Sequence, residues 1–202
     1  MAFSPDPENT ALIVVDVQND ACHENGALAK LGRSVATIQP VVPKIAELIS
    51  SARKASVPVI FVITHHDPFT DSLAWRSRQI YEEDKIICLT GSWGAESYQI
   101  DRKDADYVIV KNRYSGFHET NLNLVLNTLG RRKLLFCGFT TNVCVETTLR
   151  DATSRDFIAA LVSDCAAAFT PEEHQNSMIN IERYFGSLTT LQEVKQFWGL
   201  GN

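Results

Sequence analysis

The chain has 202 residues, of which 45% are hydrophobic and 21% are charged, and its formal net charge is -5. This length and composition fit one globular domain with a full apolar core, so we expect a single domain over residues 1–202. The mild acidity and the lack of long lysine or arginine runs argue against nucleic-acid binding and against membrane-surface binding.

The N-terminal segment and the cysteines indicate a reducing compartment. The sequence begins with MAFSPDPENT, which is polar and unlike a secretory signal peptide, and no apolar run is long enough to span a bilayer. The five cysteines are odd in number and widely spaced, and none forms a CxxC pair. This pattern argues against a disulfide framework or a zinc cluster, so we expect a cytoplasmic protein.

Short apolar, β-branched segments alternate along the chain with longer amphipathic segments. Strands are predicted at residues 11–16, 58–63, 107–111, 134–138, 157–163 and 187–190. Runs such as ALIVV and PVIFVI are apolar on both faces, as expected for strands that lie between two helical layers. Helices are predicted at residues 35–55, 120–129, 142–154 and 171–185. This alternation predicts an α/β fold with an open, mostly parallel sheet covered on both faces.

The last predicted helix has a clear start, with Thr170 as the cap and Pro171 at the first helical position.

A long insert, roughly residues 64–105, separates the second and third predicted strands. Long loops in compact domains often carry function, so the insert is expected to be a lid or an oligomer contact. A helical excursion without a role is the alternative.

Three reactive residues stand at the ends of predicted strands. Asp16 closes ALIVVD, Lys111 closes YVIVK, and Cys144 follows LLFCGFTTNV. Open α/β sheets bind their ligands outside the carboxyl ends of the strands. The three side chains together therefore predict one site, although Asp16 or Lys111 alone is more often structural.

Cys144 has the most specific local setting, because the turn that precedes it is followed by a predicted helix. The N-terminus of a helix favours a thiolate over a thiol, and the Lys111 ammonium is expected to add to this effect. We therefore predict a lowered pKa for Cys144, aided by a base that takes the proton during attack. A buried structural cysteine is the alternative, and it is our interpretation of Cys137 and Cys165.

No dinucleotide-binding, P-loop, zinc-protease or serine-hydrolase motif occurs in the sequence. His65, His66 and Asp67 follow the second predicted strand and raise the possibility of a metal site. Neighbouring histidines in a strand or helix point to different sides, however, and no separate ligand set accompanies them. We predict no metal and no cofactor.

Four segments, in this order, resemble the isochorismatase-like cysteine hydrolases: TALIVVDVQND (10–20), VIVKNRYSGFHETNL (108–122), CGFTTNVCVETTLRDA (137–152) and FIAALVSDCAAAFTPEEH (157–174). The resemblance covers nearly the whole chain. It is closest to members that act on ureido or carbamoyl compounds, such as ureidoacrylate amidohydrolases and biuret hydrolases. It implies a three-layer α/β/α fold with a six-stranded, mostly parallel sheet, assembled as a dimer or tetramer.

The resemblance also implies functional residues. Asp16, Lys111 and Cys144 correspond to the catalytic triad of the family. A cis peptide bond is implied between Phe139 and Thr140, and the N–H groups of Thr140 and Cys144 are then expected to form an oxyanion hole. Nicotinamidase-type members carry an Asp-x-His metal motif, and Thr64-His65-His66-Asp67 lacks that spacing.

We therefore predict a cysteine hydrolase that cleaves a C–N bond of a small amide, ureide or carbamoyl compound through a thioester. Gln18 is expected beside the substrate pocket, where it orients the triad or a loop around it. The expected pocket walls are Asn19, Trp93, Tyr114 and Phe117. For the aromatic residues among them, core packing is an equal alternative. The competing functions are a vinyl-ether hydrolase acting on isochorismate and a redox-sensing or catalytically silent thiol protein.

Overall fold

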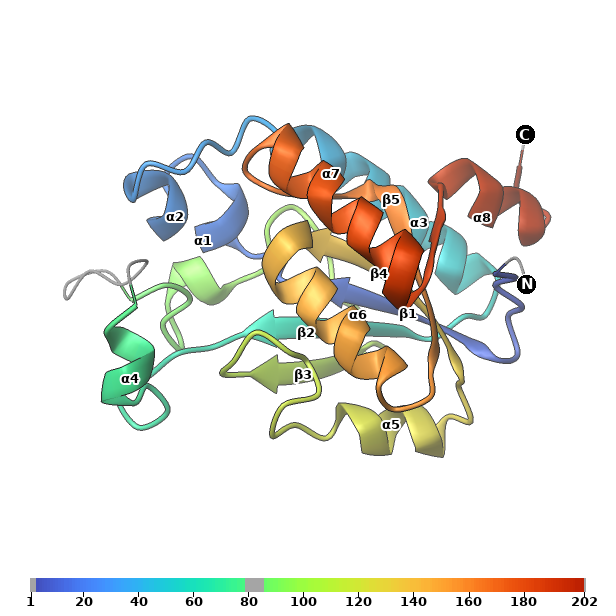
Figure 1. The fold of residues 1–202 in the computed structure, drawn as a ribbon, viewed down its shortest axis with the longest axis horizontal. Helices are drawn as coiled ribbons and strands as arrows, with labels where there is room; N and C mark the ends of the chain where they lie inside the picture. The colour runs from blue at the N-terminus through green and yellow to red at the C-terminus, as the bar shows by residue number, and fades with distance from the viewer. Residues whose placement is uncertain (1–2, 79–85, 202) are drawn as a thin grey trace.

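The computed structural model describes residues 3–78 and 86–201. Six parallel strands form one sheet in the order β3-β2-β1-β4-β5-β6 (Figure 1). The strands are β1 (Thr10–Val15), β2 (Val59–Thr64), β3 (Tyr107–Lys111), β4 (Lys133–Phe139), β5 (Ile158–Ala167) and β6 (Ser187–Thr189). The α/β fold class and the six-stranded parallel sheet predicted from the sequence are confirmed.

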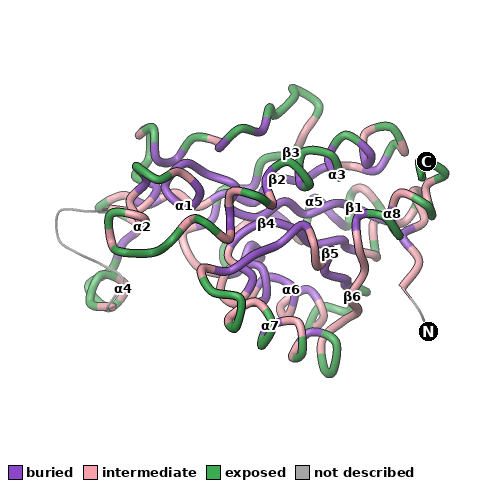
Figure 2. Tube along the Cα trace, turned by 90° about the horizontal axis from the view of Figure 1, so that it is seen from above, coloured by how far each residue is buried: buried purple, intermediate pink, exposed green. Residues whose placement is uncertain are grey.

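Two layers of helices cover the sheet (Figure 1). One face carries α3 (Val42–Lys54) and α8 (Leu191–Phe197), and the other carries α5 (Leu122–Thr128), α6 (Glu146–Thr153) and α7 (Pro171–Asn180). Successive side chains of a strand point to opposite faces. Leu12 and Val14 of β1 therefore pack toward α3 and α8, whereas Ile13 packs toward the other helices. Figure 2 shows the resulting burial, which is concentrated along the strands.

The predicted helices differ from the observed ones mainly at their ends. The helix predicted at 35–55 begins with the short 3-10 turn η1 (Gln39–Val41), and the one predicted at 171–185 ends in the π-helical turn η4 (Ile181–Phe185). The expected start of α7 is confirmed, because Thr170 and Glu173 form a reciprocal capping box. Helix α8 was not predicted, although its own capping box of Thr190 and Glu193 gives a start signal.

Short helical segments gather at the carboxyl ends of the strands, away from both chain termini (Figure 1). They are α1 (Asn19–Cys22), α2 (Ala27–Lys30), α4 (Leu73–Arg76) and η2 (Trp93–Ala95). Isolated bridges from Gln18 to Ser97 and from His66 to Leu89 attach the long insert to this edge. The described part of the insert therefore lies over the ends of the central strands. Its expected role as a lid or an oligomer contact stays a prediction.

The strand order reverses between β1 and β4. Strands β2 and β3 follow β1 toward one edge of the sheet, and β5 and β6 follow β4 toward the other edge. Ligands of open α/β sheets bind at this point. Gly138 lies opposite Val15 there, and a Cβ at Gly138 would lie 2.0 Å from the Val15 carbonyl oxygen. The two strands can therefore approach each other only because residue 138 is glycine.

Strand β5 extends to Ala167, beyond the predicted end at residue 163, because its pairing with β4 is irregular. The pairs Phe136–Leu161 and Gly138–Ala166 show that β5 advances five residues while β4 advances two. Such an insertion bends a strand and redirects the residues that follow. It brings Ala167 opposite Phe139, next to the turn that carries Cys144.

No helix in the described residues is long and apolar enough to cross a membrane.

Candidate active site

Asp16, Lys111 and Cys144 meet at the carboxyl edge of the sheet. Asp16 follows β1, Lys111 ends β3, and Cys144 lies in the π-helical turn η3 (Thr141–Val145) between β4 and α6. The Lys111 Nζ atom is 2.8 Å from Asp16 Oδ2 and 3.5 Å from Cys144 Sγ. All three residues line one cavity of about 190 Å³. The structure thus brings together the three strand-end residues that the sequence singled out.

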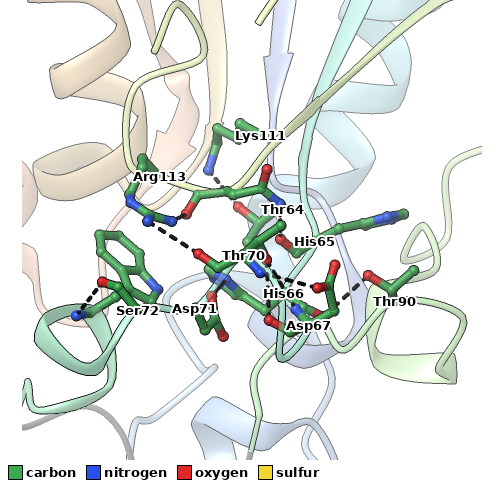
Figure 3. Close-up of polar contacts among 12 residues, drawn as sticks. Thr64, His65, His66, Asp67, Thr70, Asp71, Ser72, Thr90, Lys111 and Arg113 are labelled. Atoms are coloured by element: carbon green, nitrogen blue, oxygen red, sulfur yellow. Dashed lines mark hydrogen bonds and ion pairs between the residues drawn. The ribbon is translucent and has the colours of Figure 1, made fainter. Parts of the chain in front are cut away.

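Thr64 joins two of these residues and was missed from the sequence. It ends β2, the strand between β1 and β3. Its Oγ1 donates a hydrogen bond of 2.9 Å to Asp16 Oδ1. The same Oγ1 accepts a hydrogen bond from Lys111 Nζ (Figure 3). The signal in the sequence was its position, since it closes an apolar strand as Asp16 and Lys111 do.

The ion pair of Asp16 and Lys111 is buried, with 7% and 1% of the two residues exposed. Burying two charges costs free energy unless each keeps hydrogen-bond partners, which Thr64 supplies to both. Burial alone would lower the pKa of Lys111, but the Asp16 carboxylate and the hydrogen bonds to Asp16 and to the Cys144 sulfur outweigh it and raise the pKa. Lys111 is therefore a permanent cation beside the sulfur.

Asp16 reaches this position through an unusual backbone angle. Its φ is 49°, in the left-handed region that aspartate tolerates better than most residues. The same turn sends the N–H of Gln18 back to the Asp16 carbonyl oxygen at 2.9 Å. The strand therefore stops at Asp16, and its carboxylate is held over the end of the sheet.

Cys144 is a thiol at rest, contrary to the lowered pKa expected from the sequence. Burial raises the pKa of Cys144 to about 12, the Lys111 ammonium opposes this rise, and the Asp16 carboxylate adds to it. The expectation was wrong because it counted the favourable cation but neither the loss of solvation nor the adjacent carboxylate. Asp16 is therefore placed to accept the proton of the thiol.

The turn before Cys144 is fixed by several contacts. The peptide bond between Phe139 and Thr140 is cis, at the place that the resemblance implied, and both residues line the cavity. The Thr140 carbonyl oxygen accepts hydrogen bonds from the N–H groups of Val143 and Val145 at 3.2 and 3.3 Å. Within the described residues, the N–H groups of Thr140 and Cys144 donate to no loop or side-chain oxygen. The oxyanion hole expected from these two N–H groups stays a prediction.

Gln18 does not line the cavity, in contrast to the expectation for the pocket. It is fully buried, and its amide donates to the carbonyl oxygens of Thr64 and Ala95 at 2.9 and 2.8 Å. Its Oε1 accepts the Thr64 N–H at 2.8 Å. Gln18 therefore fixes the end of β2 and one residue of the insert, which agrees with the expected orienting role.

The predicted pocket walls are mostly elsewhere, and only Tyr114 lines the cavity. Asn19 is buried and donates to the Trp93 carbonyl oxygen at 2.7 Å, so it positions the insert. The Trp93 ring packs against His23 outside the cavity. Phe117 packs in the core, with its ring 5.8 Å from that of Phe157. Phe117 therefore follows the core-packing alternative, whereas Trp93 is 47% exposed and belongs to neither the core nor the cavity wall.

The insert supplies wall residues that the sequence did not identify. Trp75 and Arg78 line the cavity together with Tyr114 and Arg113 from the segment after β3. The Trp75 and Tyr114 rings lie 5.1 Å apart, and the Arg78 guanidinium is stacked on Trp75. The signal was weak because the four-residue helix α4 is too short to show a periodic pattern.

His66 also lines the cavity, and His65 does not. The two rings point to different sides, as expected (Figure 3). His66 is buried and its Nδ1 lies 2.8 Å from Asp71 Oδ1. Burial lowers the pKa of His66, and the Asp71 carboxylate opposes this shift. No group of three or more potential metal ligands occurs in the part of the chain that the structure describes.

Comparison with known proteins gives consistent matches over the chain. The model of the isochorismatase domain matches residues 10–193. The ureidoacrylate amidohydrolase RutB of Methylobacterium radiotolerans is 35% identical over 210 residues, which cover 96% of this chain and 81% of that protein. The match therefore includes the strand ends that carry Asp16, Lys111 and Cys144.

Two solved structures are similar in both fold and sequence. A cysteine hydrolase from Pseudomonas syringae pv. phaseolicola superposes with a TM-score of 0.87 at 29% identity, covering 98% of this chain and 96% of that one. An N-carbamoylsarcosine amidase from Thermoplasma acidophilum superposes with a TM-score of 0.75 at 26% identity, covering 93% and 99%.

Proposed function

The chain belongs to the isochorismatase family of hydrolases, and we propose that it cleaves the C–N bond of a small ureido or carbamoyl compound with Cys144 as the nucleophile. One observation carries this proposal: the Lys111 ammonium contacts both the Asp16 carboxylate and the Cys144 sulfur at the cavity wall. The similarity to a ureidoacrylate amidohydrolase and to an N-carbamoylsarcosine amidase supports the substrate class.

In the first half of the reaction, Cys144 Sγ attacks the carbonyl carbon of the substrate and Asp16 takes the thiol proton. A C–S bond forms and the carbonyl electron pair moves to oxygen. The N–H groups of Thr140 and Cys144 hold this oxyanion, and one such donor contributes about 10²–10³ in rate. When the C–N bond breaks, Asp16 returns its proton to the leaving nitrogen.

In the second half, water attacks the thioester and Asp16 takes one of its protons. The C–O bond forms and the C–S bond breaks, so that an acid is released and the proton on Asp16 returns to the sulfur. Asp16 therefore carries a proton in both halves. This shuttling fits a resting thiol, because a high pKa for Cys144 leaves little thiolate before the base acts.

Lys111 supports both halves without transferring a proton. Its raised pKa keeps it charged, and its Nζ lies within 3.5 Å of the sulfur. A positive charge at this distance stabilises negative charge that develops on sulfur during attack and again when the thioester is cleaved.

The test is ammonia release from a panel of ureidoacrylate, biuret, N-carbamoyl amino acids, nicotinamide and maleamate. We expect turnover of at least one ureido or carbamoyl compound, and we expect Cys144→Ser to abolish it. Cys22→Ala is the matched control, because Cys22 is buried in the core and lies outside the cavity. Full activity in Cys144→Ser would rule out the nucleophile.

Two further measurements separate the competing functions. Pyruvate release from isochorismate would indicate a vinyl-ether hydrolase, which needs no thiol nucleophile. Intact-protein mass spectrometry after mixing with substrate is expected to show an acyl adduct on Cys144. A sulfenic acid after peroxide, with no adduct from any substrate, would instead indicate a redox thiol.

A further inference from the structure

Among the described residues that line the active-site cavity, positive side chains outnumber negative ones. Its charged lining residues are Arg33, Arg78, Lys111, Arg113, Asp16 and Glu173. Both carboxylates already have partners: Asp16 pairs with Lys111, and Glu173 accepts the Thr170 N–H of its capping box at 3.2 Å. Among the described lining residues, neither carboxylate therefore pairs with Arg113.

Arg113 is the arginine whose surroundings are most fully defined. It lies two residues after Lys111 and is half-buried. Its Nη1 donates to the Asn112 carbonyl oxygen at 2.7 Å. Its Nη2 donates to the Thr70 carbonyl oxygen at 3.1 Å (Figure 3). Both acceptors are neutral, and in the described part of the chain no carboxylate pairs with this guanidinium.

The position of the Arg113 guanidinium is fixed by packing as well. Its Cζ lies 4.6 Å from the centre of the Trp75 ring, on which the Arg78 guanidinium is also stacked at 3.1 Å. A guanidinium has five N–H donors in a planar fork, and the two carbonyl contacts occupy only two of them. The unused donors match the geometry of a carboxylate, which accepts two parallel hydrogen bonds.

Resting on the proposed function, we propose that Arg113 binds the carboxylate of an anionic substrate whose ureido or carbamoyl carbon faces Cys144. The substrate class is therefore a carbamoyl or ureido acid, rather than a neutral amide. Arg113 is then a specificity residue, and Trp75 positions its guanidinium. Trp75 is stacked against both guanidinium groups at this wall.

The experiment compares ureidoacrylate with its neutral N-methylamide, because the two differ only in the charged group. We expect the wild-type enzyme to prefer the acid, and Arg113→Met to lower kcat/KM for the acid about 10- to 100-fold, mainly through KM, as for the loss of a charged hydrogen bond. The N-methylamide should change less than about threefold, since it makes no such bond. Arg132→Met is the charge-matched control, because Arg132 precedes β4 at the opposite edge of the sheet.

Arg113→Lys distinguishes charge from a structural role, because it keeps the cation and should retain part of the acid preference. Equal losses on both substrates in Arg113→Met and Arg113→Lys would overturn the proposal. A wild-type enzyme that cleaves both substrates equally well would also overturn it, while leaving the proposed function intact.

Binding tests the subsite even if neither compound is cleaved. Calorimetry with the Cys144→Ala protein is expected to show ureidoacrylate binding that weakens about 10- to 100-fold when Arg113→Met is added. No binding, or binding that is unaffected by Arg113→Met, would refute the subsite. A failure of turnover with intact, Arg113-dependent binding would count against the proposed reaction alone.

Discussion

Replacing Thr64 by valine removes the hydroxyl that joins Asp16 to Lys111 and leaves the side-chain volume nearly unchanged. The Thr64 hydroxyl donates to the carboxylate at 2.9 Å and accepts from the ammonium. A hydrogen bond to a charged group contributes about 1.5–3 kcal/mol. If one such contribution is lost from the transition state, kcat falls about 10- to 150-fold.

The assay is steady-state ammonia release, with kcat and KM determined separately for Thr64→Val and Thr64→Ser. We expect the loss in kcat, with little change in KM, because Thr64 contacts Asp16, the proposed proton carrier, and makes no contact with the proposed carboxylate subsite at Arg113. Thr64→Ser keeps the hydroxyl and should stay within a few-fold of the wild type. A Thr64→Val enzyme with the wild-type kcat, or a Thr64→Ser enzyme as slow as Thr64→Val, would refute the role of the hydroxyl.

Four further predictions concern charge, reactivity, packing and assembly. Lys111→Met should lower the free energy of unfolding by about 3–5 kcal/mol in urea titrations, because it leaves the buried Asp16 carboxylate without its cation. Adding Asp16→Asn to the Lys111→Met protein should restore part of this loss. The rate of Cys144 alkylation by iodoacetamide should rise continuously from pH 7 to pH 10. The pKa of Cys144 is raised to about 12, so the thiolate fraction still grows over this whole range. A plateau in the rate below pH 8 would contradict this prediction. Gly138→Ala should yield little folded protein, as judged by expression and circular dichroism, because its Cβ would lie 2.0 Å from the Val15 carbonyl oxygen and its φ is 111°. Light scattering should detect the dimer or tetramer that the resemblance implies, and a monomer at micromolar concentration would argue against it.

The sheet and the three reactive residues were predictable because each rests on a local signal. Parallel strands often form continuous apolar runs, and Asp16 and Lys111 each interrupt such a run at its end. Thr64 ends its strand in the same way, but threonine is common in strands and does not stand out as a reactive residue. Its role becomes visible only when β2 is placed between β1 and β3.

The pocket and the protonation of Cys144 depend on the fold and were not predictable in the same way. Trp75 and Arg113 meet through contacts between the insert and the segment after β3, which no periodic pattern encodes. Trp93 was expected in the wall on its residue type alone, and it packs elsewhere. The raised pKa of Cys144 follows from burial beside Asp16, which is a property of the assembled site.

The site takes one side chain from the end of each of three adjacent strands and a fourth from the turn after β4. Thr64 lies directly opposite Lys111 in the ladder of β2 and β3. A shift of one residue in any of these pairings would turn the affected side chain to the other face of the sheet. Covalent titration of Cys144 by substrate would therefore count only molecules with correctly aligned strands. During refolding, such a titration would report completion of the central sheet separately from the helix signal of circular dichroism.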